Sequence, residues 1–292
     1  MSSLPRTCCV MASDAPFFYQ IRASVETFDA VRKSVGADMK VIALGLDQSQ
    51  MDWLCSRGIE IVTGVESRVP RFRDSPLHAI AMTCRPFIPE LFPGYEAYMW
   101  IDSDIRFLHP DGFNQYMESL IQPRCSIAIA SESEPAYCFN HVPAFANAYH
   151  EQKYARLCAA FGEEVANYLR YTLPFNAGIF AAPADSPLWS RYKRNLDRTL
   201  ALPYNAMREQ DAMLVSIVEV QDVVRMPSVA NWVCSARMPA VDDRIGGRVF
   251  LNPDKPTEKI LVAHLAASSK PVFLDGKMQT LYNTYQLHGL TT

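Results

Sequence analysis

Short apolar runs alternate with segments of helical spacing through the first hundred residues of the chain. Apolar runs of strand length lie at residues 7–12, 40–46 and 59–65. Between them, residues 17–32 place apolar side chains at helical spacing, and residues 51–57 form a shorter helical segment. Strands that alternate with helices favour a mostly parallel sheet, because each crossover helix returns the chain to the same edge of the sheet. The pattern therefore predicts an α/β fold.

The rest of the chain is less regular, and we predict its elements segment by segment. Ser75 followed by Pro76 is typical of a helix start, so we expect a helix from there toward Cys84 or Arg85. Further strands are predicted at 97–101, 126–130, 175–182 and 259–263, and further helices at 141–161, 186–202 and 208–220.

Composition and charge argue against several classes of protein. Hydrophobic residues make up 49% of the 292 residues, so a sizeable core is available. The formal net charge of -3 gives no electrostatic footprint for nucleic acid. No apolar run approaches the ~20 residues of a membrane span, and residues 1–12 lack a signal-peptide core, so we expect a cytoplasmic protein. None of the eight cysteines forms a Cys-x-x-Cys pair, which favours buried, reduced thiols.

Two carboxylates follow the most apolar of the predicted strands. Residues 97–101 are apolar at every position, and Asp102 and Asp104 come directly after them. Open α/β sheets bind ligands at the carboxyl ends of their strands, and residues two apart on an extended chain point the same way. Two such carboxylates repel each other unless a cation or a proton relieves them, and a hard divalent cation suits carboxylate oxygen. The alternative is that one aspartate caps a turn while the other is solvated.

Five separated segments carry a resemblance to a known family. In chain order they are residues 85–93 (RPFIPELFP), 98–104 (YMWIDSD), 175–179 (FNAGI), 209–212 (EQDA) and 264–271 (HLAASSKP). Together they resemble the retaining glycosyltransferases of the glycogenin and bacterial lipo-oligosaccharide galactosyltransferase type. The resemblance implies a GT-A fold, the nucleotide-diphospho-sugar transferase fold, in which a mixed, mostly parallel central sheet is flanked by helices. Residues 1–292 would form one such domain, with a nucleotide-binding half (1–108), an acceptor and sugar half (109–275) and a C-terminal tail (276–292).

The resemblance implies a metal-dependent hexosyltransferase. Asp102, Asp104 and His264 would hold Mn²⁺ or Mg²⁺ against the two phosphates of a nucleotide diphosphate sugar, which the family leads us to expect is a UDP-sugar. Two carboxylates and one imidazole suit manganese somewhat better than magnesium. The hexose would pass, with retention of configuration, to a saccharide, a lipid-linked glycan or another hydroxyl acceptor. A hydrogen-bonded histidine at a strand end is the structural alternative for His264.

The same resemblance assigns further residues to the substrate, and each has a structural alternative. Lys270 would contact the phosphates, although most lysines are simply solvated. Arg85 would bind phosphate or sugar oxygens, or else cover a helix C-terminus. Asp14 would lie near the base or ribose, but an Asx-turn is at least as good an interpretation. Asn176 and Gln210 are candidates for contacts with the donor sugar and Ala177 for the substrate site, while Asp211 would bind a sugar hydroxyl or cap its helix.

The catalytic residues implied by the resemblance are Gln210, Glu209 and Asp211. Gln210 or Glu209 would stabilise the positive sugar ring during attack on the same face, while the leaving phosphate takes the acceptor proton. Because a helix N-terminus favours acidic residues, Glu209 and Asp211 also have a purely structural explanation. Glu209 stands where the family usually has Asp, and Ala267 where it usually has Gly, so both positions depart from the pattern.

Two other functions stay open. A non-catalytic nucleotide-sugar-binding protein would keep the fold, and the departures at Glu209 and Ala267 are compatible with it. A sugar-phosphate nucleotidyltransferase would share the nucleotide-binding sheet but normally has a glycine-rich loop after the first strand. This chain reads ASDAPF at residues 12–17, without glycine, so we rank the nucleotidyltransferase lowest.

Overall fold

The computed structural model describes residues 4–133, 143–234, 237–242 and 249–266. Its main feature is a seven-stranded sheet with the strand order β3-β2-β1-β4-β7-β6-β8. The strands are β1 (Thr7–Asp14), β2 (Asp38–Leu44), β3 (Glu60–Val62), β4 (Ala97–Ile101), β6 (Ile127–Ser131), β7 (Phe175–Pro183) and β8 (Val223–Met226). Every neighbouring pair is parallel except the two pairs that β7 makes, with β4 and with β6. The predicted mixed, mostly parallel sheet is confirmed.

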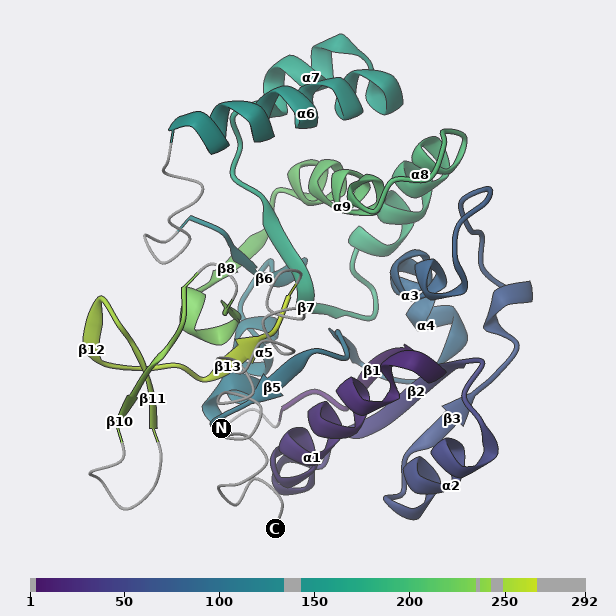
Figure 1. The fold of residues 1–292 in the computed structure, drawn as a ribbon, viewed down its shortest axis with the longest axis vertical. Helices are drawn as coiled ribbons and strands as arrows, with labels where there is room; N and C mark the ends of the chain where they lie inside the picture. The colour runs from purple at the N-terminus through teal and green to yellow at the C-terminus, as the bar shows by residue number, and fades with distance from the viewer. Residues whose placement is uncertain (1–3, 134–142, 235–236, 243–248, 267–292) are drawn as a thin grey trace.

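Helices cover both faces of this sheet, because each buried strand sends alternate side chains to opposite faces. In β1, Cys9 and Met11 join one hydrophobic core while Cys8 and Val10 join the other. The first core is closed by α1 (Phe18–Val35), α2 (Gln48–Ser56) and α5 (Asp111–Leu120), and the second by α3 (Ile80–Thr83), α4 (Ile88–Leu91), α8 (Leu188–Leu200) and α9 (Met207–Val220). Figure 1 shows these helices on both sides of the central sheet.

A pair of helices, α6 (Pro143–Phe161) and α7 (Glu163–Leu169), lies at one end of the molecule (Figure 1). Leu157 of α6 and Leu169 of α7 are buried in the second core. The helix predicted at 141–161 is confirmed from Pro143 onward, whereas α7 was not predicted.

Two small sheets complete the described fold. One has the order β5-β13-β9, from β5 (Ile105–Phe107), β13 (Val262–His264) and β9 (Trp232–Val233); the other is β10 (Ala240–Asp242), β11 (Val249–Asn252) and β12 (Lys255–Lys259). The strand predicted at 259–263 is therefore wrong as a single element, because β12 ends before a break and β13 begins after it. Since β13 pairs antiparallel with β5, His264 lies opposite Ile105. Ile105 directly follows Asp104, so the pairing brings His264 close to the two aspartates.

The helix predicted from Ser75 is also wrong in form. The Ser75 hydroxyl donates to the Phe72 carbonyl at 2.8 Å and caps no helix. The segment is instead a series of single helical turns: η3 (Leu77–Ala79), α3, η4 (Arg85–Phe87) and α4. Pro86 and Pro89 explain the interruption, because proline lacks the N–H that a continuous helix needs.

In the described part of the chain, no helix has both the length and the apolarity needed to cross a bilayer. The seven cysteines within this part all have free thiols. Burial raises the pKa of Cys84 to about 12, so that thiol stays protonated at neutral pH.

Candidate functional site

A cavity of about 280 Å³ opens where β1 and β4 end, next to the short turns around Arg85 and the first turn of α9. Its walls include five of the residues singled out from the sequence: Asp14, Arg85, Asp102, Asp104 and Gln210. Ligands bind at this edge in open α/β sheets, because the strand ends leave a crevice between the connecting loops. Folding thus brings residues from four distant parts of the sequence to one opening.

Two side chains, one from its own strand and one from η4, donate hydrogen bonds to Asp102. Its Oδ1 accepts a 2.6 Å hydrogen bond from the Trp100 indole Nε1 and a 2.7 Å bond from Arg85 Nη2. Trp100 and Asp102 point the same way because they lie two residues apart at the end of an extended strand. The Asp102 backbone N–H donates to the Gly178 carbonyl at 2.7 Å, which ties β4 to β7 at the same level.

The chain does not stay extended after Asp102. It turns at Ser103, and the Ile105 N–H donates to the Asp102 carbonyl at 3.1 Å. The turn brings the Asp104 carboxylate to 3.4 Å from His264 Nε2. One ligand atom from each of Asp102, Asp104 and His264 lies within 4.8 Å of the others. The predicted convergence of these three side chains is present, but a turn produces it rather than an extended strand.

The surroundings of His264 fit a metal ligand better than a core histidine. The imidazole is buried, yet its Nδ1 has no hydrogen-bond partner among the described residues. A buried polar atom without a partner is costly unless a ligand or water satisfies it. Two carboxylates and one imidazole in reach of one point are a donor set suited to a divalent cation. The three residues therefore fit the metal that the resemblance implies.

Gly178 on β7 makes room for the His264 ring. A Cβ built on Gly178 would lie 2.8 Å from His264 Nδ1 and 2.9 Å from Nε2, closer than atoms pack. The glycine requirement here is close approach, since no side chain fits between β7 and the imidazole. Gly178 belongs to the FNAGI segment of the resemblance, but no sequence pattern indicates that it packs against His264.

Arg85 joins the aspartate of the cavity to a buried glutamate. Its Nη1 donates to Glu209 at 2.8 Å while Nη2 holds Asp102, and its guanidinium lies 5.2 Å from the centre of the Trp100 ring. Tyr192 of α8 donates its hydroxyl to the other oxygen of Glu209. Burial alone would lower the pKa of Arg85, but the charges of Asp102 and Glu209 outweigh burial and raise it. The arginine stays charged, and it keeps both carboxylates in place.

Glu209 lies beneath the cavity and does not line it. Its side chain is fully buried, and both oxygens are occupied by Arg85 and Tyr192. Burial raises the pKa of Glu209 to about 7, although Arg85 acts in the opposite direction. The carboxylate of Glu209 therefore lies against Arg85 rather than at the opening.

Asp211 and Asn176, both expected to contact the sugar, are engaged inside the protein. Arg156 of α6 binds Asp211 with two hydrogen bonds, of 2.6 Å and 3.1 Å. Burial raises the pKa of Asp211, and Arg156 partly offsets the increase. The Asn176 amide donates to Glu132 at 3.0 Å and accepts from the Gly178 N–H at 3.0 Å and from Asn231 at 3.1 Å.

The remaining predicted residues divide into three cases. Gln210 is half-buried and lines the cavity, and no described residue hydrogen-bonds to its amide. Asp14 lines the cavity and also caps the next turn, where its Oδ1 accepts a 3.3 Å bond from the Phe17 N–H; its contact with a base or ribose stays a prediction. Ala177 is buried in the second core. Lys270, like Ala267, lies outside the described residues.

The sequence did not indicate which residues donate hydrogen bonds to the acids of the site. Trp100, Tyr192 and Arg156 were interpreted as strand or helix residues, and each turns out to hold an acid at or beside the cavity. A strand tryptophan two residues before an aspartate was the one local signal available, because that spacing puts both side chains on the same face. The contact between Tyr192 and Glu209 spans 17 positions of the sequence, and the contact between Arg156 and Asp211 spans 55. No local pattern could indicate either contact.

No protein-family model and no curated protein sequence matches this chain. Solved structures do match it. The galactosyltransferase LgtC, in complex with donor and acceptor sugar analogues, is 11% identical with a TM-score of 0.60, over 97% of this chain and 96% of LgtC. The bifunctional glycosyltransferase WbbM in its apo form is 15% identical with a TM-score of 0.60, over 97% of this chain and 52% of WbbM.

The apo-form glycosyltransferase GlyE from Streptococcus pneumoniae TIGR4 is 14% identical with a TM-score of 0.55, over 98% of this chain and 61% of GlyE. At sequence identities this low, the likeness shows a shared fold and nothing about activity. The chain has the GT-A fold, as the five sequence segments implied.

Proposed function

We propose that this chain is a metal-dependent hexosyltransferase that uses a nucleotide diphosphate sugar, a UDP-sugar by analogy with the family, and retains configuration at the anomeric carbon. The convergence of Asp102, Asp104 and His264 carries the proposal, because the two aspartates also line the cavity. A divalent cation bound there would neutralise negative charge on the departing diphosphate. Asp102 follows the carboxyl end of β4, the edge where open α/β sheets bind ligands, and this position supports the same interpretation.

The residues around the cation site have distinct tasks in this proposal. Arg85 holds Asp102 in the orientation for metal binding and adds positive potential beneath the diphosphate. Gln210 offers its amide to the sugar, since an amide can both donate to and accept from hydroxyl groups. Lys270 is proposed to contact the phosphates as a point charge.

The state of the acids beside Gln210 supports attack on the same face without a protein nucleophile. Glu209 and Asp211 are both buried, and an arginine binds each of them. Double displacement needs a free carboxylate against the anomeric carbon, as in retaining glycosidases. In our proposal the acceptor hydroxyl attacks from the side of the leaving phosphate, which accepts its proton.

Thermal unfolding and donor hydrolysis test the proposal together. With UDP and Mn²⁺ both present, we expect the unfolding temperature to rise, because a ligand that binds the folded state stabilises it. Neither component alone should give the full shift. UDP-glucose and UDP-galactose should then be hydrolysed slowly in the presence of Mn²⁺, with release of UDP. Absence of any shift across uridine, guanosine, adenosine and cytidine diphosphates would count against the transferase.

A nucleotide-sugar-binding protein without activity is the second candidate. The observation in its favour is the pairing of Arg85 with two carboxylates, which leaves the guanidinium less available to a substrate. In that case UDP and Mn²⁺ would raise the unfolding temperature, but neither hydrolysis nor transfer would occur with any donor sugar.

A further inference from the structure

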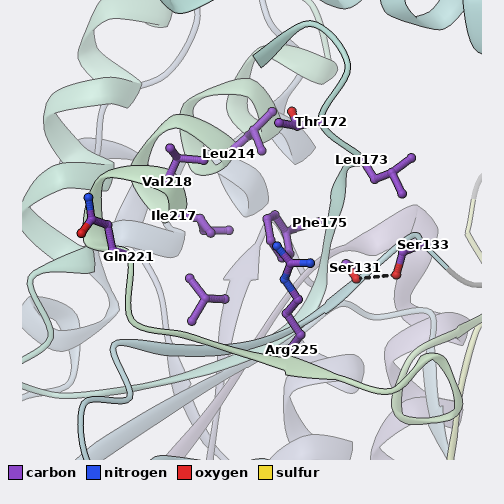
Figure 2. A pocket seen from close by; sticks show the side chains of 11 residues that line it. Ser131, Ser133, Thr172, Leu173, Phe175, Leu214, Ile217, Val218, Gln221 and Arg225 are labelled. Atoms are coloured by element: carbon purple, nitrogen blue, oxygen red, sulfur yellow. Dashed lines mark hydrogen bonds between the residues drawn. The ribbon is translucent and has the colours of Figure 1, made fainter. Parts of the chain in front are cut away.

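A second cavity, of about 410 Å³, lies between α9, β8 and the neighbouring ends of β6 and β7 (Figure 2). Six of its eleven lining side chains are apolar: Leu173, Phe175, Leu214, Ile217, Val218 and Val223. The volume lies within the range of about 300–1,000 Å³ that is usual for small-molecule sites. The pocket is therefore large enough for a small apolar group.

Among the residues that the structure describes, Arg225 is the only charged one in the lining of this pocket. Figure 2 shows its guanidinium pointing toward Phe175, with 5.9 Å between the guanidinium carbon and the ring centre. No carboxylate of the described residues forms an ion pair with Arg225. Figure 2 shows two hydroxyls near Phe175, those of Ser131 and Ser133, which are hydrogen-bonded to each other at 2.9 Å. An apolar surface with one available cation suits a ligand that is apolar and carries one negative group.

The second cavity is next to the first along two elements. Gln210 lines the first cavity and Leu214 lines the second, and they lie four residues apart on α9, about one helical turn or 6 Å. On β7, Phe175 lines the second cavity and comes three residues before Gly178, which packs on His264. A ligand in the second cavity would thus lie beside the position that the donor sugar occupies in the first.

We propose that the second cavity binds the non-reacting part of the acceptor, an apolar body that carries one carboxylate or phosphate held by Arg225. This inference rests on the proposed function, because it takes the first cavity as the donor site. A purely saccharide acceptor would find few hydrogen-bond partners on this largely apolar wall. The pocket thus selects an amphiphilic, anionic acceptor.

Binding of simple probes to the whole chain tests the proposal without turnover. Hexyl phosphate, hexanoate and hexanol share one apolar body and differ in charge, and inorganic phosphate supplies charge alone. At low ionic strength we expect hexyl phosphate or hexanoate to bind tighter than hexanol by about tenfold or more, the value of a charge-assisted hydrogen bond. Inorganic phosphate should bind more weakly than hexyl phosphate. The preference between hexyl phosphate and hexanoate identifies the anionic group.

Variants of the pocket locate the binding. Arg225→Gln should weaken the charged probes by about tenfold and leave hexanol within about twofold, whereas Arg225→Lys should keep most of the affinity. Val218→Phe should weaken all three hexyl probes by filling the space. Arg68→Gln, at an exposed arginine directly after the short turn Val65–Ser67, is the matched control and should change nothing.

Three results would overturn the proposal. They are equal binding of hexanol and the charged probes, unchanged binding by Arg225→Gln, and displacement of the probes by UDP with Mn²⁺, which would place the probes in the first cavity. Binding of UDP and Mn²⁺ is measured separately on the same samples. Its loss would count against the transferase itself, whereas intact UDP binding without probe binding would reject only the acceptor pocket.

Discussion

The two cavities lie against the same helix, α9, but they are built in opposite ways. Around the first, Asp102, Arg85 and Glu209 form a continuous chain of buried or half-buried charges, and Trp100 and Tyr192 complete it with hydrogen bonds. In the second, one exposed arginine faces a largely apolar wall.

This contrast determines how each cavity responds to change. In the first, loss of one group leaves a partner charge buried and unpaired, which costs about 3–5 kcal/mol in comparable ion pairs. In the second, Arg225 keeps its hydration, and the apolar side chains act mainly through area and shape. The first cavity is therefore expected to behave as a unit, and the second as a sum of nearly independent contacts.

The largest effect is expected for Asp104→Asn. The substitution keeps the shape but removes one anionic ligand of the cluster, and the several kcal/mol that a catalytic cation contributes correspond to a loss of activity of about 10³-fold. The measurement is UDP release from a UDP-sugar over a range of Mn²⁺ concentrations. Chelation of the metal in the wild-type chain should give a similar loss.

The control for Asp104→Asn is Asp185→Asn, at an exposed turn residue remote from the cavity. It should retain wild-type activity and metal dependence. Undiminished activity of Asp104→Asn, or full activity of the wild-type chain after chelation, would contradict the metal assignment.

Gly178→Ala should give the next largest effect. The added methyl would overlap the His264 ring, so the imidazole must move from its place beside Asp104. We expect Mn²⁺ affinity to fall about 10–100-fold, as when a metal ligand loses its support, and unfolding free energy to fall by about 1–3 kcal/mol. Isothermal titration and urea unfolding measure the two quantities.

Ile179→Val separates stability from metal binding. Ile179 lies on the same strand, and its side chain is buried in the first core. Shortening it to valine should therefore cost about 0.5–1.5 kcal/mol of stability. Its Mn²⁺ affinity should be unchanged. If Gly178→Ala binds Mn²⁺ as the wild type does, the close approach of Gly178 and His264 has no role in the site.

The parts of the fold that local pattern determines were predictable. The strands and helices between residues 7 and 62, and the strand at 97–101, follow from apolar periodicity, because each is defined by neighbours along the chain. Asp102 and Asp104 were recognisable for the same reason, since they follow a strand that is buried at every position. His264 came from the resemblance alone, and the β5–β13 pairing brings it beside them.

Charge pairing over long sequence separations was not predictable. Glu209 and Asp211 were assigned to the sugar, but Arg85 lies 124 positions from Glu209, and Arg156 lies 55 positions from Asp211. Which arginine binds which acid depends on the packing of α6, α8 and η4 around α9. The lining of the second cavity was missed for the same reason, because Phe175, Leu214 and Arg225 are ordinary residues of three separate elements.

The titration of Glu209 gives a third prediction. Because burial raises its pKa to about 7, the folded state binds a proton that the unfolded chain has already released between the ordinary value of 4.5 and about 7. Stability must therefore fall as pH rises through this window. Glu209→Gln cannot titrate, so the unfolding free energy of the wild type minus that of the variant should fall by about 2 kcal/mol from pH 5 to pH 8.

Urea unfolding without added metal measures this difference. Glu118→Gln, at an exposed glutamate of α5, is the matched control and should show no such pH dependence relative to the wild type. A difference between wild type and Glu209→Gln that stays constant with pH would mean that Arg85 keeps Glu209 ionised throughout.

The smallest effects distinguish the two cavities most directly, because they are coupling energies rather than losses. Tyr192→Phe removes the donor and Glu209→Leu the acceptor of one buried hydrogen bond, so the double variant should depart from additivity by about 0.5–3 kcal/mol in unfolding free energy. Arg225→Gln and Val218→Ala lie at residues without a mutual hydrogen bond or ion pair in the described structure, and they should add within about 0.5 kcal/mol. Equal coupling in the two cycles would remove the contrast between the cavities, because a pocket of independent contacts cannot couple as strongly as a buried network of charges.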